Sequence, residues 1–100
     1  MHGRLLPWYY CGRPRKIRTA LKKLMKSSEY RITLRALAIS AGVTRLTASQ
    51  WLTGEKIPTN NEIRDISKAF CYRRFGLVES RYRLPLQAEL QNIANHERNK

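Results

Sequence analysis

The segment Leu34–Thr59, LRALAISAGVTRLTASQWLTGEKIPT, contains two short helix-forming stretches separated by a glycine, and it decides how the rest of the chain is interpreted. Its first half carries apolar residues at the spacing of one helical face, namely Leu34, Leu37, Ala38 and Ala41. Thr33 is placed to cap this helix, and Gly42 ends it because glycine adopts a left-handed backbone without steric cost. The pattern therefore predicts a helix over 34–41 followed by a sharp turn.

A second helix is predicted directly after this turn. Thr44 is placed to cap it, and Gly54 to end it. We expect Trp51 to be buried between this helix and the next one, together with Ala48 and with Leu52 directed inward or sideways. The outward side chains are Arg45, Leu46, Ser49 and Gln50. Two helices joined by a tight glycine turn, the second with outward polar side chains, can place one helix in the major groove of DNA.

Helical spacing continues on both sides of this pair. Before it, apolar residues predict a helix from Arg15 to Met25, with Gly12 and Pro14 at its entry. After it, Thr59 and Glu62 have the spacing of a capping box and begin a helix that reaches Gly76. The apolar face of that helix consists of Ile63, Ile66, Ala69 and Phe70. No segment has the alternation of a strand, so the fold class is all-α, a compact domain of four to five helices.

The central segment closely resembles the helix-turn-helix of the Cro and phage-repressor family, also called the xenobiotic-response-element type. That family is marked by the pattern LA…aGvs…s.W..G…P, which the segment Leu34–Thr59 follows. The likeness covers roughly residues 15–72 and implies a lambda-repressor-like DNA-binding domain. We accordingly expect an apolar and basic N-terminal arm over 1–12, the helix-turn-helix domain over 13–75 and a C-terminal extension over 76–100.

The resemblance also implies which residues contact DNA. The positions that read bases in the family are occupied by Arg45, Leu46, Ser49 and Gln50. Arginine can bond guanine O6 and N7, glutamine can bond adenine N6 and N7, and leucine can meet a thymine methyl. The positions that contact the DNA backbone are occupied by Thr33, Thr44, Thr53 and Lys56. To these phosphate contacts we add the neighbouring residues Arg18, Lys22, Arg35 and Thr47.

The charge of the chain agrees with a nucleic-acid partner. Lys and Arg number 20 against 7 Asp and Glu, a formal charge of +13 that exceeds what solubility requires. Nine of the 20 lie in residues 1–32, together with a single Glu. On the first predicted helix, cations without intervening acids favour phosphate contact over a merely solvated face, because like charges at i, i+4 repel. For four basic residues nearer the C-terminus, the sequence does not distinguish a phosphate contact from a solvated surface position: Arg73, Arg74, Arg81 and Arg83.

Several other classes of protein are disfavoured. One Asp and two His, His2 and His96 near the two ends, do not assemble a catalytic set or a zinc site, so we expect no enzyme, no metal and no cofactor. No charge-free stretch approaches the roughly 20 residues of a membrane span. The apolar segment Leu5–Cys11 is broken by Pro7 and has no signal-peptide cleavage site. We expect Cys11 and Cys71 to be free thiols in the cytoplasm.

The two ends of the chain are the least defined by sequence. Pro85 is predicted to start a last helix whose residues 95–100 are frayed, and no helix is assigned to residues 77–84. The apolar stripe of that helix consists of Leu86, Leu90, Ile93 and Ala94. This stripe is a candidate for the homodimer contact, with packing inside the chain as the alternative. The arm Leu5–Cys11 has three alternatives: a dimer element, a cover for the core, or a recognition element for a second protein.

The leading hypothesis is a sequence-specific DNA-binding transcriptional regulator of bacterial or phage type. We expect a repressor that occludes a promoter when a homodimer reads two half-sites of double-stranded DNA. The alternative is an antitoxin or accessory protein whose arm or C-terminal stripe binds a partner protein.

Overall fold

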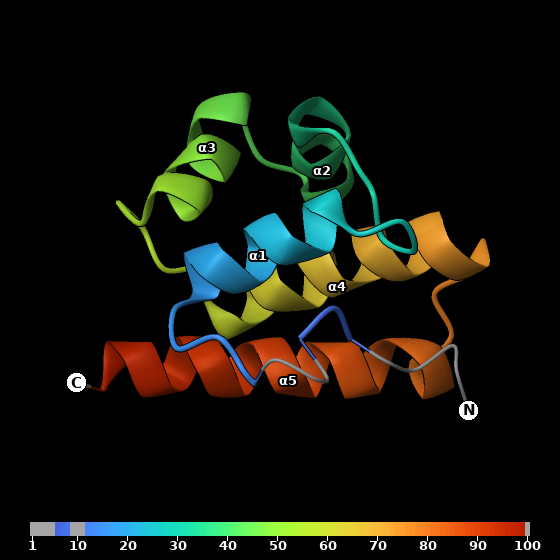
Figure 1. The fold of residues 1–100 in the computed structure, drawn as a ribbon. Helices are drawn as coiled ribbons and strands as arrows, with labels where there is room; N and C mark the ends of the chain where they lie inside the picture. The colour runs from blue at the N-terminus through green and yellow to red at the C-terminus, as the bar shows by residue number, and fades with distance from the viewer. Residues whose placement is uncertain (1–5, 9–11, 100) are drawn as a thin grey trace.

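Helices make up most of the computed structural model, which describes residues 6–8 and 12–99 and contains no strand among them. The five helices are α1 (Ile17–Lys26), α2 (Leu34–Ala41), α3 (Arg45–Thr53), α4 (Asn60–Phe75) and α5 (Ser80–Arg98). They form three layers: α2 and α3 on one side, α1 and α4 in the middle, and α5 on the opposite side (Figure 1). The prediction of an all-α fold is therefore confirmed.

The predicted helix boundaries in the centre of the chain are also confirmed. The hydroxyls of Thr33, Thr44 and Thr59 each accept a hydrogen bond from the backbone N–H three residues later, at 3.1 to 3.2 Å. The capping box that begins α4 is complete, since the Glu62 carboxylate accepts the Thr59 N–H at 2.9 Å. Gly42 ends α2 with φ of 73°, a left-handed conformation that permits the chain to turn within three residues into α3.

One hydrophobic core includes residues from all five helices. Helix α4 packs against α2 and α5, while α3 packs against α1 and α2. Trp51 is 1% exposed, as expected of a core residue. Its helix packs mainly against α1 and α2, and the prediction that the Trp51 side chain fills the space between α3 and α4 stays a prediction. The segment Leu34–Thr59 therefore packs on both middle-layer helices, α2 on α4 and α3 on α1.

The last helix differs from its prediction at both ends. It begins at Ser80, so Pro85 is its sixth residue rather than its first. A proline there removes one backbone hydrogen bond, which the burial of the following apolar stripe offsets. The helix also continues to Arg98, whose guanidinium donates to the Pro58 carbonyl and to Asn95 Oδ1, both at 2.6 Å. These contacts hold the segment that was expected to fray.

The apolar stripe of α5 lies inside the molecule. Its four members are exposed by 3% or less: Leu86, Leu90, Ile93 and Ala94. They belong to the same core as the other helices, because α5 packs against α4 and α1. The hypothesis that this stripe forms a homodimer contact was wrong, since the chain itself has already removed the stripe from water.

The described part of the N-terminal arm lies along α5 (Figure 1). Trp8 is buried, and its indole Nε1 donates to Glu89 Oε2 at 3.1 Å. Arg13 forms two further hydrogen bonds with the Glu89 carboxylate, at 2.8 and 2.9 Å. Of the three alternatives for the arm, Trp8 therefore supports a cover for the core. The rest of that prediction, Leu5 and residues 9–11, falls outside the described residues.

Helix α1 depends on a residue from the other end of the chain. Its N-cap, Lys16, makes no side-chain capping bond. Instead, the Glu97 carboxylate on α5 accepts the Ile17 N–H at 2.9 Å. An acidic group at a helix N-terminus satisfies an unpaired donor and interacts favourably with the helix dipole. The first and last helices are thereby joined by a specific polar contact.

Candidate nucleic-acid interface

Helix α3 presents one side to the core and the other to solvent. Ala48 and Trp51 are buried, whereas Arg45 and Leu46 are exposed, Leu46 by 68%. The two remaining predicted base-reading residues, Ser49 and Gln50, are half-buried. Among the described residues, no side-chain hydrogen bond or ion pair occupies Arg45 or Gln50. The polar groups of this outer face are therefore free to bond another molecule.

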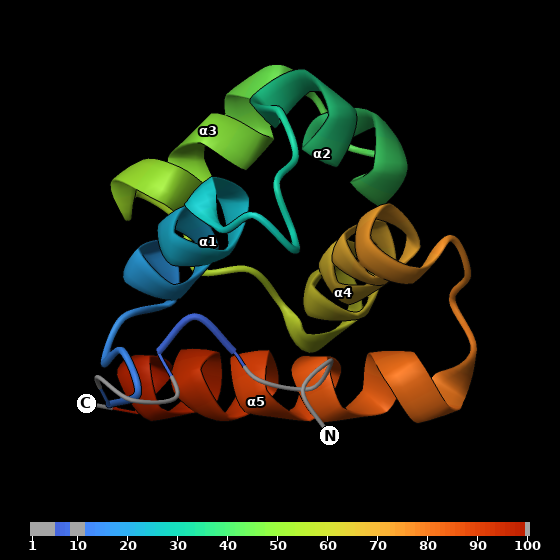
Figure 2. The same ribbon diagram turned by 45° about the vertical axis from the view of Figure 1, so that its right-hand side comes forward.

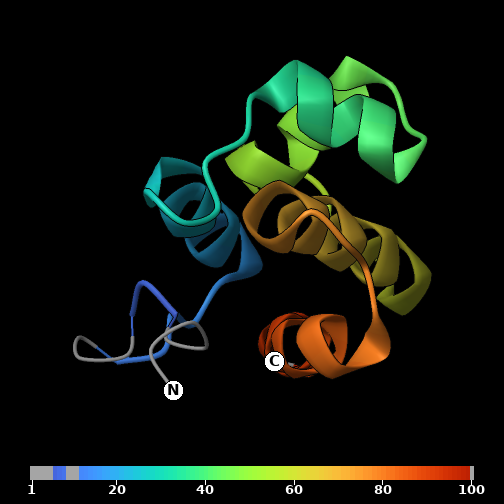
Figure 3. The ribbon, with the colours of Figure 1, turned by 90° about the vertical axis from the view of Figure 1, so that its right-hand side faces the viewer.

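The N-terminal ends of α2 and α3 lie together on the side of the molecule away from α5 (Figures 2 and 3). Thr33 and Thr44 cap these ends, and both residues are exposed. The Thr44 hydroxyl also donates a hydrogen bond to the Thr47 hydroxyl, at 3.1 Å. Helix N-termini carry unpaired N–H groups and partial positive charge, so this side of the molecule attracts phosphate.

Helix α1 adds cations next to the end of α3. Arg18 Nη1 lies 3.4 Å from the Thr53 carbonyl oxygen. The Arg18 stem runs so close to Gly54 that a Cβ there would lie 2.9 Å from Arg18 Cδ. Lys22 follows Arg18 by one helical turn on the same face of α1 and is exposed. Three of the predicted phosphate contacts, Arg18, Lys22 and Thr53, are thereby gathered on one side.

Three further predicted phosphate contacts, Arg35, Thr47 and Lys56, form no contact with the described residues of α1 that resembles the one between Arg18 and Thr53. Arg35 lies on α2 and Lys56 lies in the loop after α3, where its backbone N–H bonds the Gln50 carbonyl at 3.2 Å. Thr47 is half-buried in the first turn of α3. All eight predicted phosphate contacts therefore lie on α1, on α2 and its cap, or on α3, its cap and the loop that follows it.

The four basic residues left open by sequence separate into two groups. Arg73 donates to the Arg31 carbonyl at 2.7 Å and lines a groove with Thr33, at the N-terminal end of α2. Arg74 and Arg81 instead lie over aromatic rings at the junction of α4 and α5. Arg83, on α5, lies near the buried Cys71. Arg73 therefore borders the candidate interface, whereas the other three belong to a different part of the molecule.

Charge is distributed unequally between the helices. Helices α1, α2 and α3 carry six Lys and Arg residues and no acid. Helices α4 and α5 carry seven Lys and Arg residues together with four acids. Glu29 and Glu55 lie in loops that border α1 and α3. Excess positive charge on a helix layer with outward polar side chains is the electrostatic pattern of a surface that binds a polyanion.

Two features of this surface were missed by sequence reasoning. Ile39 on α2 is 69% exposed. Its exposure could have been predicted, because Ile39 does not belong to the apolar stripe of that helix. The contact between Arg18 and Thr53 had no sequence signal, because the two residues are 35 positions apart. Both features extend the candidate interface beyond α3.

Comparison with known proteins does not add a relative: a scan against family models, a search of curated proteins and a search of solved structures each found no match. The described helices include none with the length and apolar content needed to cross a membrane. Within residues 6–8 and 12–99, no group of three or more His, Cys, Asp and Glu residues is placed to hold a metal ion.

One of the two cysteines can be assessed. Cys71 is a free, fully buried thiol whose Sγ donates to the Tyr82 carbonyl at 3.3 Å. Burial raises the pKa of Cys71 to about 11, against an ordinary value of 9.0. A thiol in this state is a poor nucleophile and acts as a packing residue. Cys11 lies outside the described residues.

Proposed function

We propose that this chain is a sequence-specific DNA-binding protein with a lambda-repressor-like helix-turn-helix domain. The observation that carries the proposal is the outer face of α3, where exposed Arg45 and Leu46 accompany half-exposed Ser49 and Gln50. Helix α3 and the two helices on which it packs, α1 and α2, contain no acidic residue. A helix about 10–12 Å in diameter fits the major groove, which is about 12 Å wide.

In this proposal the side chains of α3 divide the task of reading bases. Arg45 bonds the O6 and N7 atoms of a guanine, and Gln50 bonds the N6 and N7 atoms of an adenine. Leu46 contacts a thymine methyl, for which its large exposure leaves room. Ser49 lies half-buried between them and accepts or donates a single hydrogen bond.

The remaining contacts hold the helix in register. The N-terminal ends of α2 and α3 face the phosphates, and Thr33 and Thr44 contribute hydroxyls there. Arg18 and Lys22 on α1 and Lys56 after α3 neutralise phosphates along the strand, and the neutral hydroxyl of Thr53 forms a hydrogen bond with one. Arg35 and Thr47 complete the set. Helix α5 lies on the far side of the molecule and leaves this approach open (Figure 2).

The biological role that follows is transcriptional repression by a homodimer. One recognition helix reads only a few base pairs, whereas a two-fold dimer reads two half-sites about 34 Å apart. The dimer contact must use a surface other than the buried stripe Leu86–Ala94. The alternative of a partner-binding protein is less favoured, because Trp8 and this same stripe, on which it depended, are buried within the chain.

Selection of duplexes from a random pool tests the proposal. We expect the wild-type protein to enrich one sequence arranged as an inverted repeat, with centres one helical turn apart. The control is a protein with both Arg45→Ala and Gln50→Ala, which keeps the fold because neither side chain bonds another described residue. Enrichment of the same sequence by this double variant, or of no sequence by the wild type, would contradict the proposal.

A further inference from the structure

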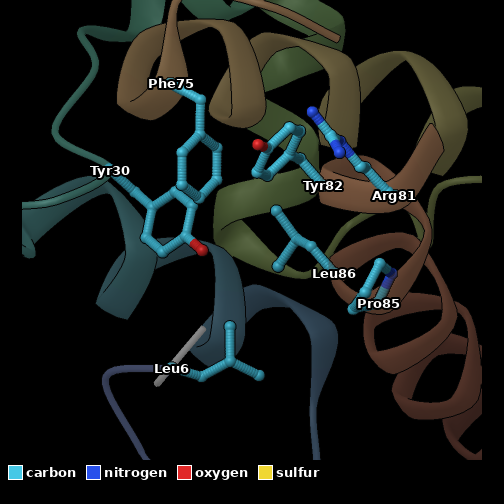
Figure 4. Close-up of a pocket in the computed structure, with 7 residues that line it drawn as sticks. All are labelled: Leu6, Tyr30, Phe75, Arg81, Tyr82, Pro85 and Leu86. Atoms are coloured by element: carbon cyan, nitrogen blue, oxygen red, sulfur yellow. The ribbon is translucent and has the colours of Figure 1, made fainter. Parts of the chain in front are cut away.

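A small hollow lies at the junction of α4 and α5 (Figure 4). It encloses about 390 Å³, part of which is open to solvent. Three aromatic rings line it, from Tyr30, Phe75 and Tyr82. The aliphatic side chains of Leu6, Pro85 and Leu86 complete the wall. The enclosed part of the hollow is only about 50 Å³, so a ligand ring enters it in part and stays partly in contact with solvent.

The rings are arranged for contact with a flat apolar group. Phe75 and Tyr82 have centroids 4.9 Å apart and planes inclined by 34°. Tyr30 is held from behind by Phe70, edge to face at 6.1 Å. In Figure 4 the three rings and Leu86 surround a common space, and the Tyr30 hydroxyl points toward it. Burial raises the pKa of Tyr30, so this hydroxyl stays protonated and can donate a hydrogen bond.

Positive charge surrounds the same rings. Arg81 lines the hollow, with its guanidinium carbon 4.9 Å from the centroid of Tyr82. Arg74 lies 4.9 Å from the Tyr30 centroid and 5.0 Å from the Phe75 centroid. The one carboxylate bonded to either guanidinium among the described residues is that of Glu79, 3.3 Å from Arg81 Nε. That pair is exposed and therefore weak, so Arg81 can turn to another anion.

Two buried guanidinium donors close to Cys71, neither of which lines the hollow, also lack hydrogen-bond partners among the described residues. Arg74 Nη1 and Arg83 Nε are removed from solvent and bond no described atom. Both arginines lie near Cys71, whose pKa they lower against the larger effect of burial. Together with Arg81 they add positive charge around this end of the molecule, which favours an anion over a cation.

From these observations we propose that the hollow is a binding site for a small aromatic carboxylate. The ring of the ligand lies among Tyr30, Phe75 and Tyr82, and its carboxylate faces Arg81 and the Tyr30 hydroxyl. Aromatic stacking supplies the preference for a flat ring, and the guanidinium supplies the preference for negative charge. This site goes beyond the proposed DNA contact and shares no residue with it.

Titration of the full chain with benzoate, followed by amide and arginine side-chain NMR shifts, tests the proposal. We expect saturable shifts at Tyr82, Leu86 and the Arg81 guanidinium, with a dissociation constant on the order of 1 mM for a ligand of this size. Benzamide, which lacks the charge, and cyclohexanecarboxylate, which lacks the aromatic ring, are expected to bind at least about tenfold more weakly. No DNA is present, so failure here is separate from failure of the DNA-binding proposal.

A pair of matched variants identifies the site. Arg81→Gln removes an exposed guanidinium from the hollow and is expected to weaken benzoate binding about tenfold. Arg64→Gln removes another exposed guanidinium that is paired with a neighbouring acid, near the other end of α4, and should leave binding unchanged. The amide spectrum of each variant shows that it is folded. Absence of saturable shifts, equal binding of cyclohexanecarboxylate, or unchanged affinity in folded Arg81→Gln would each overturn the proposal.

Discussion

Replacement of Arg45 by alanine separates base reading from general attraction to DNA. Arg45 is the first residue of α3, it is exposed, and its side chain bonds no other described residue. The cap at Thr44 remains, so the free energy of unfolding should change by no more than about 0.5 kcal/mol. On the selected duplex, loss of a bidentate contact to guanine is expected to weaken binding by about 1–3 kcal/mol. This corresponds to an increase in Kd of about 5- to 150-fold.

The assay compares two duplexes at one fixed salt concentration, the selected sequence and a scrambled version of it. For Arg45→Ala we expect the large loss only on the selected duplex, because nonspecific binding depends on the total phosphate contacts. Arg35→Ala is the matched control, since Arg35 is an exposed arginine on α2 assigned to phosphate. It should weaken both duplexes by a similar factor. If Arg45→Ala also weakened both duplexes equally, α3 would not be the helix that reads bases.

Three further predictions concern charge, the core and the buried thiol. Lys22→Ala should weaken binding to all duplexes alike and reduce the slope of log K against log salt by about one, measured from 50 to 200 mM salt; an unchanged slope would remove Lys22 from the interface. Leu90→Asp places a carboxylate at a fully buried position and should lower the free energy of unfolding in urea by more than about 3 kcal/mol, whereas a stably folded variant would contradict the position of α5. In a Cys11→Ser background, Cys71 should react with a thiol reagent slowly in the folded protein and rapidly in urea, and fast labelling of the folded protein would refute its burial. Because burial raises the pKa of Cys71 in the folded state, the free energy of unfolding should fall as pH rises from 9.0 to about 11.

Features that depend on residues three or four positions apart were predictable. The caps Thr33, Thr44 and Thr59 and the left-handed Gly42 act within a single turn of helix, so their effect does not require the rest of the chain. Helical periodicity likewise placed Trp51 in the core and Arg45 on the outer face of α3. The candidate base-reading face therefore follows from local physics, together with the likeness of its pattern to a known family.

Features that depend on distant residues were not predictable. The extension of α5 back to Ser80 runs against the local preference of Pro85, and it occurs because the helix buries its stripe on α1 and α4. The Glu97 bond to Ile17 joins residues 80 positions apart. In the same way, the hollow at the junction of α4 and α5 combines Tyr30, from the loop after α1, with Tyr82 on α5. No sequence pattern specifies such pairs in advance.

The stripe Leu86–Ala94 shows most directly which features the sequence does not determine. Its helical spacing by itself determined that one face of the last helix must leave water. Whether that face packs within the chain or against a second copy was decided only by the tertiary structure, which buries it against the middle-layer helices. The physical reason is that the hydrophobic effect depends on the area removed from water and has no direction, so it does not specify the surface that covers it.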